Sequence, residues 1–243
     1  MAGTAKTLLL GFLLVLAVAA TSTQAAATML TLHNLCPYPV WPLVTPNTGF
    51  PAISENTGRL DGGGRGLVSF RFPDSFWAGR VVARTGCSSS SGPPPSSRCE
   101  TGSAPPATVV PLVVHAEAEG WQQDLAAYSV SLVDGFNVPA VVSPQAVGGG
   151  QCPALGCAAD LNAGGPPSQR VPGARGAVVA CKGPPPGYFK ERCPLTRTTA
   201  TDVEPVPQRC FAPGEIKVVF CQSAMVNAAA GDAGRIRTVV ADN

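Results

Sequence analysis

The sequence lacks the features that mark nucleic-acid-binding, metal-binding and membrane-spanning proteins. Charged residues make up only 13% of the 243 residues, the net charge is +2, and Lys and Arg are scattered, which excludes a basic nucleic-acid surface. There are two histidines, His33 and His115, and no Cys-x-x-Cys pair, so no metal site is expected. No Gly-x-Ser-x-Gly elbow or phosphate-binding loop occurs, so no cofactor is expected either.

Only the N-terminus carries a continuous apolar run. This run, Leu8 to Ala20, is shorter than the ~20 residues that a membrane span needs. It follows Lys6 and precedes the small residues Ala25 to Ala27, an order typical of a signal peptide. We expect residues 1–26 to be removed, which lowers the net charge to +1. The mature protein is then secreted and has no stable membrane anchor.

Turn-forming residues and cysteine are abundant. Gly 27 and Pro 25 favour many turns and short strands over long helices. Cysteines in an exported chain indicate disulfides, and their odd number leaves one thiol without a partner. Spacing alone does not choose among the many possible pairings. The nine cysteines are Cys36, Cys87, Cys99, Cys152, Cys157, Cys181, Cys193, Cys210 and Cys221.

Alternation of apolar and polar residues predicts a mainly β fold. A first strand begins at Thr28, and later strands are expected at Gly66–Phe72, Ala78–Thr85, Val109–His115, Tyr128–Val133, Val138–Val142 and Glu215–Cys221. Composition predicts loops at residues 45–65 and 87–107. Short helical turns are expected at Cys152–Asn162 and Tyr188–Cys193.

The stretch Ser129–Pro139 is where the sequence most clearly presents a functional group. Val130 and Leu132 fall on one face of the expected strand, and Asp134-Gly135 breaks it because Gly tolerates turn geometry. A carboxylate is thereby presented at the strand's end.

Two other polar patterns each allow two interpretations, a functional site or a solvent-exposed surface. Arg80 and Arg84 share one face of a strand, and such basic residues are more often in solvent than in a site. Glu117 and Glu119 suggest paired carboxylates for acid–base chemistry. Their alternative is an exposed acidic hairpin, because nothing apolar surrounds them to raise a pKa.

Six segments in order resemble the thaumatin-like family, the pathogenesis-related group five defence proteins of plants. They are Asn34–Trp41, Gly79–Cys87, Ser131–Pro139, Cys152–Asp160, Tyr188–Pro194 and Val218–Cys221. The resemblance implies an antiparallel β-sandwich over residues 27–221, with a reduced, disulfide-tied lobe of loops and short helices at about 144–208 and a tail at 222–243. The chain is shortened between Asn162 and Tyr188, as in a small or degenerate member.

The resemblance also implies the disulfides that spacing left open. The implied pairs are Cys36–Cys221, Cys87–Cys99, Cys152–Cys210 and Cys157–Cys193. Cys181 is left unpaired.

Antifungal members of the family carry an acidic cleft of an arginine, a glutamate and three aspartates. The arginine corresponds to Arg80 and the second aspartate to Asp134, while the other three positions fall on Pro111, Ser129 and Leu195. We therefore expect Arg80 and Asp134 to be the cleft's ligand-binding residues and to pair across it. No catalytic residue is expected, because glycoside hydrolysis needs two carboxyl groups.

The resemblance implies a secreted, non-catalytic defence protein that binds cell-wall polysaccharide of the β-1,3-glucan type, with an antifungal or stress-response role. The alternatives are a weak endo-β-1,3-glucanase, a protease- or amylase-inhibitor-type protein that presents residues 88–107, and a diverged copy with little activity. The expected partner is a polysaccharide or a secreted protein, and the expected state is a monomer. The expected location is the apoplast, or the vacuole if residues 222–243 act as a sorting signal.

Overall fold

The computed structural model describes residues 28–54, 58–88, 98–115, 125–146, 152–183, 187–202, 209–211 and 213–223. The expected signal peptide, Glu117 and Glu119, and most of the expected tail lie outside these residues. Within the described residues, every helix is too short or too polar to cross a membrane.

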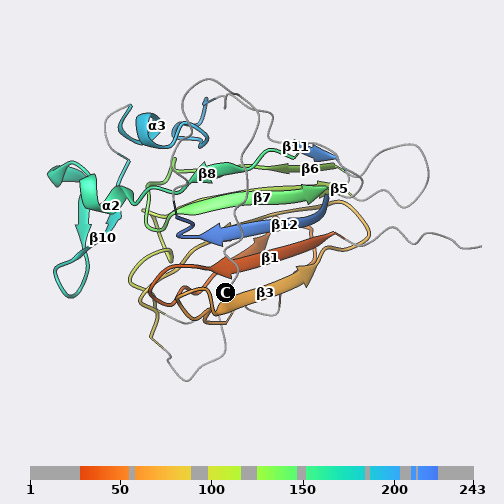
Figure 1. The fold of residues 1–243 in the computed structure, drawn as a ribbon, viewed down its shortest axis with the longest axis horizontal. Coiled ribbons are helices and arrows are strands. Elements are labelled where there is room, and N and C mark those ends of the chain that lie inside the picture. The colour runs from red at the N-terminus through yellow and green to blue at the C-terminus, as the bar shows by residue number, and fades with distance from the viewer. Residues whose placement is uncertain are drawn as a thin grey trace, which may run out of the picture.

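Two five-stranded sheets form the body of the protein (Figure 1). The first, the β1 sheet, has the order β3 (Gly66–Arg71), β1 (Met29–Asn34), β12 (Pro213–Phe220), β7 (Ala140–Ala146) and β8 (Leu155–Cys157). The second, the β5 sheet, has the order β11 (Arg209–Phe211), β6 (Leu125–Tyr128), β5 (Val109–His115), β4 (Trp77–Val82) and β2 (Leu43–Pro46). The sandwich that the sequence predicts is confirmed.

Alternating side chains from both sheets fill the space between them. The β1 sheet contributes every second residue of its strands, for example Leu30, Leu32 and Val218, each fully buried. The β5 sheet contributes Val110 and Leu112 to the same cluster. This shared core buries one side of each sheet. On the other side of the β5 sheet Arg80 of β4 is exposed, while Ala78 and Val82 of the same strand are buried.

The first and last strands are joined in an unexpected direction. Among the strand pairs in the described part of the chain, β1 and β12 are parallel, with Asn34 opposite Phe220, and the others are antiparallel. Their C-terminal ends therefore lie side by side. Cys36 and Cys221 follow these ends and form a disulfide with a Cα–Cα distance of 4.8 Å, which ties the two ends of the domain together.

Three more disulfides join Cys87 to Cys99, Cys152 to Cys210 and Cys157 to Cys193. Together with Cys36–Cys221 these are the pairs that the family resemblance implies. Cys181 is a free, fully buried thiol.

The predicted strand at Tyr128–Val133 is interrupted after Tyr128. Leu112 lies opposite Tyr128, and Val109 exchanges two hydrogen bonds with Ser131, so the register is continuous and Pro111 faces Ser129. The Ser129 N–H donates to the Pro111 carbonyl at 3.2 Å. The return bond is missing because Pro has no N–H, and the regular ladder therefore stops at Tyr128.

The smaller lobe lies at one end of the sandwich (Figure 1). It contains α2 (Leu161–Gly164), η1 (Pro167–Gln169), β9 (Arg170–Pro172), β10 (Val178–Cys181) and α3 (Tyr188–Arg192). Two backbone hydrogen bonds between Phe136 and Cys181, of 2.8 and 2.7 Å, attach it to the core.

The sequence placed one lobe element correctly and another wrongly. A helix over Tyr188–Arg192 matches the expected helical turn. The turn expected at Cys152–Asn162 is instead strand β8 followed by α2, because Asp160 caps a helix that begins only at Leu161. Gly156 has φ +138°, and a Cβ there would collide with the Ala140 carbonyl oxygen, so this close strand approach requires glycine.

Candidate binding face on the β5 sheet

Three of the five positions that correspond to the family's cleft residues form a row across the β5 sheet. Arg80 of β4 lies opposite Pro111 of β5, and Pro111 in turn faces Ser129. On the other side of Arg80, Thr45 of β2 completes the row. Since opposing residues of a sheet share a face, these side chains lie together, with no acid among them.

The fourth position, Leu195, lies beside the same row. The segment that follows it runs along Val130–Leu132: the Arg197 N–H donates to the Val130 carbonyl at 2.9 Å, and the Leu132 N–H donates to the Arg197 carbonyl at 2.7 Å. Leu195 itself is half-buried against the core. The family's acidic position is thus occupied by a side chain used for packing.

The fifth position, Asp134, lies apart from Arg80. Its carbonyl accepts a hydrogen bond from Ala107 at 3.3 Å, whereas Arg80 is paired with Pro111. Ala107 precedes Pro111 by four residues, which span roughly 13 Å in an extended chain. Arg80 and Asp134 are both exposed, and the ion pair expected between them is absent from the described residues. Their ligand-binding roles stay predictions.

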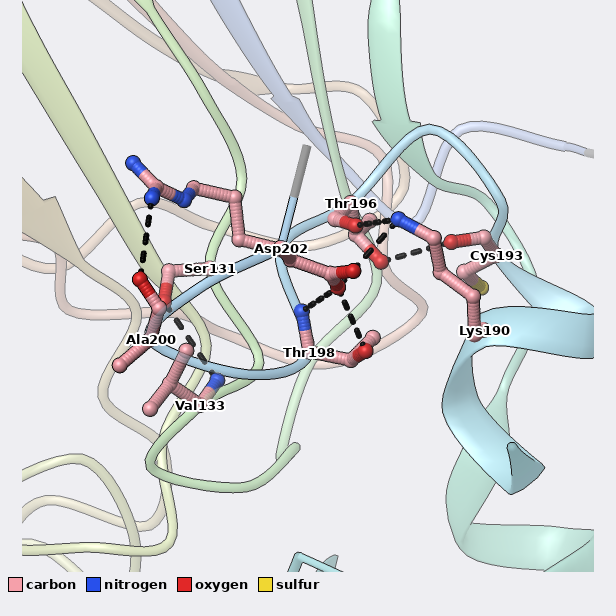
Figure 2. Close-up of polar contacts among 9 residues, drawn as sticks. Ser131, Val133, Lys190, Cys193, Thr196, Thr198, Ala200 and Asp202 are labelled. Carbon is pink, nitrogen blue, oxygen red and sulfur yellow. Dashed lines mark hydrogen bonds and ion pairs between the residues drawn. The ribbon is translucent and has the colours of Figure 1, made fainter. Parts of the chain in front are cut away.

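Polar contacts fix the segment of residues 196–202 that borders the row (Figure 2). Lys190 of α3 donates to the Thr196 carbonyl at 2.9 Å and lies 3.3 Å from the Asp202 carboxylate. Asp202 also accepts from the backbone N–H and the hydroxyl of Thr198, both at 2.7 Å. The hydrogen bonds from Thr198, reinforced by Lys190, lower the pKa of Asp202 to about 2. This aspartate is therefore ionised and structurally engaged, unlike a general acid.

Two candidate binding residues that the sequence did not identify, Arg209 and Phe211, lie on the outward side of the β5 sheet. In β11, Cys210 points into the core while Arg209 and Phe211 point outward, and Arg209 lies opposite Ala127, which is opposite Val113. We call this outward side the β5 face. It is formed by Thr45, Arg80, Pro111, Val113, Ala127, Ser129, Arg209 and Phe211. The one sequence signal for Arg209 is the polar–apolar alternation from Arg209 to Cys210. This alternation is too short to predict a strand.

A pocket of about 210 Å³ lies between the sandwich and the lobe. It is lined by residues 99–106 together with Val171 and Ala180. Glu100 is the acid in its lining, and its carboxylate accepts a hydrogen bond from the Ala174 N–H at 2.6 Å. Neither Arg80 nor Asp134 lines this pocket, so it is separate from the β5 face.

Arg84 does not share a strand face with Arg80 as expected, because β4 ends at Val82. Arg84 is only 9% exposed, and its Nε donates to the Trp41 carbonyl at 3.0 Å. Burial lowers its pKa. Arg80 is exposed, so it is the arginine of this pair that a ligand can reach.

No group of three or more His, Cys, Asp or Glu side chains suitable for a metal ion occurs within the described part of the chain. The acidic pair Glu117 and Glu119 falls outside that part. The chemistry available on the β5 face is thus hydrogen bonding, charge attraction by arginine and apolar contact.

The structure defines a class of protein: a β-sandwich that is closed by four disulfides and carries a small lobe at one end. A protein-family model, described as the Thaumatin family, matches residues 34–186 of this chain. An osmotin-like protein of Solanum lycopersicum is 35% identical over 79% of this chain and 88% of its own length. The chain therefore belongs to the thaumatin family.

Other relatives carry more specific names. Thaumatin-like protein 1 of Prunus persica is 33% identical over 81% of this chain and 91% of its own length. A protein of Prunus avium named glucan endo-1,3-beta-glucosidase is 34% identical over 71% of this chain and 76% of its own. The solved structure of the thaumatin-like xylanase inhibitor TLXI aligns with 79% of this chain and 99% of its own, with a TM-score of 0.45 and 22% identity.

Proposed function

We propose that this protein is a secreted, non-catalytic defence protein that binds polysaccharides of cell walls, β-1,3-glucan among them, through the β5 face. Membership of the thaumatin family supports the defence role, and one relative's name includes a β-1,3-glucan activity. An antifungal or stress-response effect would follow from this binding.

The observation that carries the proposal is the row Arg80–Pro111–Ser129. These three positions, which correspond to cleft positions of the family, oppose one another across adjacent strands. The row keeps the arginine, which can donate several hydrogen bonds to sugar hydroxyl groups. Arg80 is exposed and Ser129 is buried, so the arginine is the group through which this row would contact a ligand.

The same row argues against hydrolysis. Glycoside hydrolases place two carboxyl groups on either side of the scissile bond, one as acid and one as base or nucleophile. Proline, serine and leucine occupy the acidic positions. Asp202 lies in the segment of residues 196–202 that borders the row. Thr198 and Lys190 hold its carboxylate ionised, so it does not supply a proton.

The proposal is tested by exposing the mature protein to insoluble β-1,3-glucan and other insoluble wall polysaccharides. We expect retention on the solid without release of reducing sugar. Reducing sugar released by the wild type and lost in Asp134→Asn would instead support the hydrolase. No retention on any wall polysaccharide would refute binding.

Secretion is part of the proposal and has its own support. Four disulfides are common in exported proteins and rare in reducing compartments. Expression of the full chain in plant cells, followed by N-terminal sequencing of the secreted form, is expected to show that residues 1–26 have been removed. Retention of the intact chain inside the cytoplasm would contradict this.

A further inference from the structure

The β5 face carries positive charge where the family's cleft positions would carry negative charge. Arg80 and Arg209 project from this face, as their registers with Pro111 and Ala127 show. Both are exposed. Neither makes an ion pair with any residue that the structure describes. The described residues of the face include no carboxylate.

The surface between the two arginines is apolar. Pro111, Val113 and Ala127 lie between them, each half-buried. Phe211 lies two residues from Arg209 on the same side and is 49% exposed. Aliphatic and aromatic surfaces of this kind contact the C–H faces of sugar rings.

The spacing of the arginines suits a polymer better than a single sugar. Three strand spacings separate β4 from β11, roughly 14 Å, with an offset of two residues, about 7 Å, along the strands. One ligand that reaches both arginines must extend across four strands. A chain with acidic groups at intervals meets this condition.

From this arrangement we propose that the β5 face prefers carboxylated polysaccharides, that is polyuronates, to neutral glucans. A guanidinium presents paired donors that match a carboxylate, and charge-assisted hydrogen bonds are stronger than those to neutral hydroxyl groups. Two arginines without acidic partners among the described residues also favour a positive potential on the face, which would attract a polyanion. The inference rests on the proposed function, because it specifies the polymer bound at the same face.

The test compares three soluble polymers: polygalacturonate, the same polymer with its carboxyl groups methyl-esterified, and a β-1,3-glucan. Titration calorimetry at low salt is expected to show the tightest binding for polygalacturonate, with at least about tenfold weaker binding once the charge is masked. Added salt is expected to weaken only the polygalacturonate interaction, because screening acts on charge.

Variants locate the interaction. Arg80→Gln and Arg209→Gln are each expected to weaken polygalacturonate binding about fivefold to tenfold and to leave thermal unfolding unchanged, since both side chains are exposed. Arg65→Gln is the matched control. Arg65 is exposed in the turn before β3 of the other sheet, so the same loss of charge there is expected to have little effect.

Each alternative result is decisive. Equal binding of the esterified and free-acid polymers would overturn the charge preference while leaving polysaccharide binding intact. Binding to none of the three polymers would overturn the proposed function as well. Polygalacturonate binding that Arg80→Gln and Arg209→Gln do not weaken would place the interaction elsewhere and overturn the assignment to this face.

Discussion

Arg80 on β4 lies directly opposite Pro111 on β5, and the register continues to Ser129. The family's arginine is therefore present, but its neighbours across the sheet are a proline ring and a hydroxyl group. This relationship is the basis of the proposal that one face has changed from acidic to basic character while the fold of the family is kept. It also indicates which substitutions reverse that change.

Pro111→Glu is expected to place a carboxylate opposite Arg80. The cross-strand ion pair would contribute about 0.2–1 kcal/mol to the free energy of unfolding, and it would engage the arginine. Binding of a polyuronate should therefore weaken relative to Pro111→Gln, which has the same shape and no charge. Calorimetry on both variants checks this, and equal binding by the two would show that Arg80 is not the contact.

Asp202→Asn is expected to destabilise the protein by about 1–2 kcal/mol at pH 7, measured by urea unfolding. The folded-state pKa of about 2 lies below the ordinary value of about 3.9. The stabilisation is therefore fully present above about pH 4 and is lost as the pH falls through 2.

The control for that variant is Asp61→Asn. Asp61 pairs with Arg59 at 3.1 Å, but both side chains are 57% exposed, so its loss should change stability by less than about 0.5 kcal/mol. If the difference between wild type and Asp202→Asn is the same at pH 2 as at pH 7, the ionised carboxylate is not its source.

The disulfides are expected to differ in their contribution to stability. Cys36–Cys221 closes a sequence separation of 185 residues and Cys87–Cys99 one of 12. In the chain-entropy model the first stabilises by about 5 kcal/mol and the second by about 3 kcal/mol. Double serine variants of each pair, compared by equilibrium unfolding, check this order. A larger effect for the short loop would contradict it.

Cys181 is expected to be unreactive in the folded protein. Its side chain is fully buried, and burial raises the pKa of the thiol, so little thiolate forms and reagents lack access. Iodoacetamide at pH 7 should label nothing in the native state and one thiol in denaturant with the disulfides intact. Rapid labelling of the native protein would show that this side chain opens to solvent.

The regular parts of the fold could be predicted from the sequence because their patterns are local. Val109–His115 matches its predicted bounds, and the helix at Tyr188 was expected from its composition. The strand at Leu43–Pro46 was missed, since Pro42 precedes it, Pro46 is its last residue, and the residues that follow are typical of loops. Its pairing with β4 is a tertiary contact that no local pattern records.

The candidate site was predicted in part. The family resemblance identified Arg80 and the positions of the lost acids, and the structure brings Arg80, Pro111 and Ser129 into one row. The expected pair between Arg80 and Asp134 was wrong, because Asp134 lies in a turn beside Ala107, whereas Arg80 lies in β4 opposite Pro111. Arg209 was missed because its neighbours in the sheet belong to strands far away in the sequence.

The most direct test of the account is amide chemical-shift mapping with a defined oligogalacturonide. We predict that the largest shifts fall on β4, β5, β6 and β11 around Arg80, Val113, Ala127 and Arg209, with no cleavage of the oligosaccharide. Shifts confined to the pocket at residues 99–106, or cleavage during the titration, would contradict a non-catalytic binding site on the β5 face.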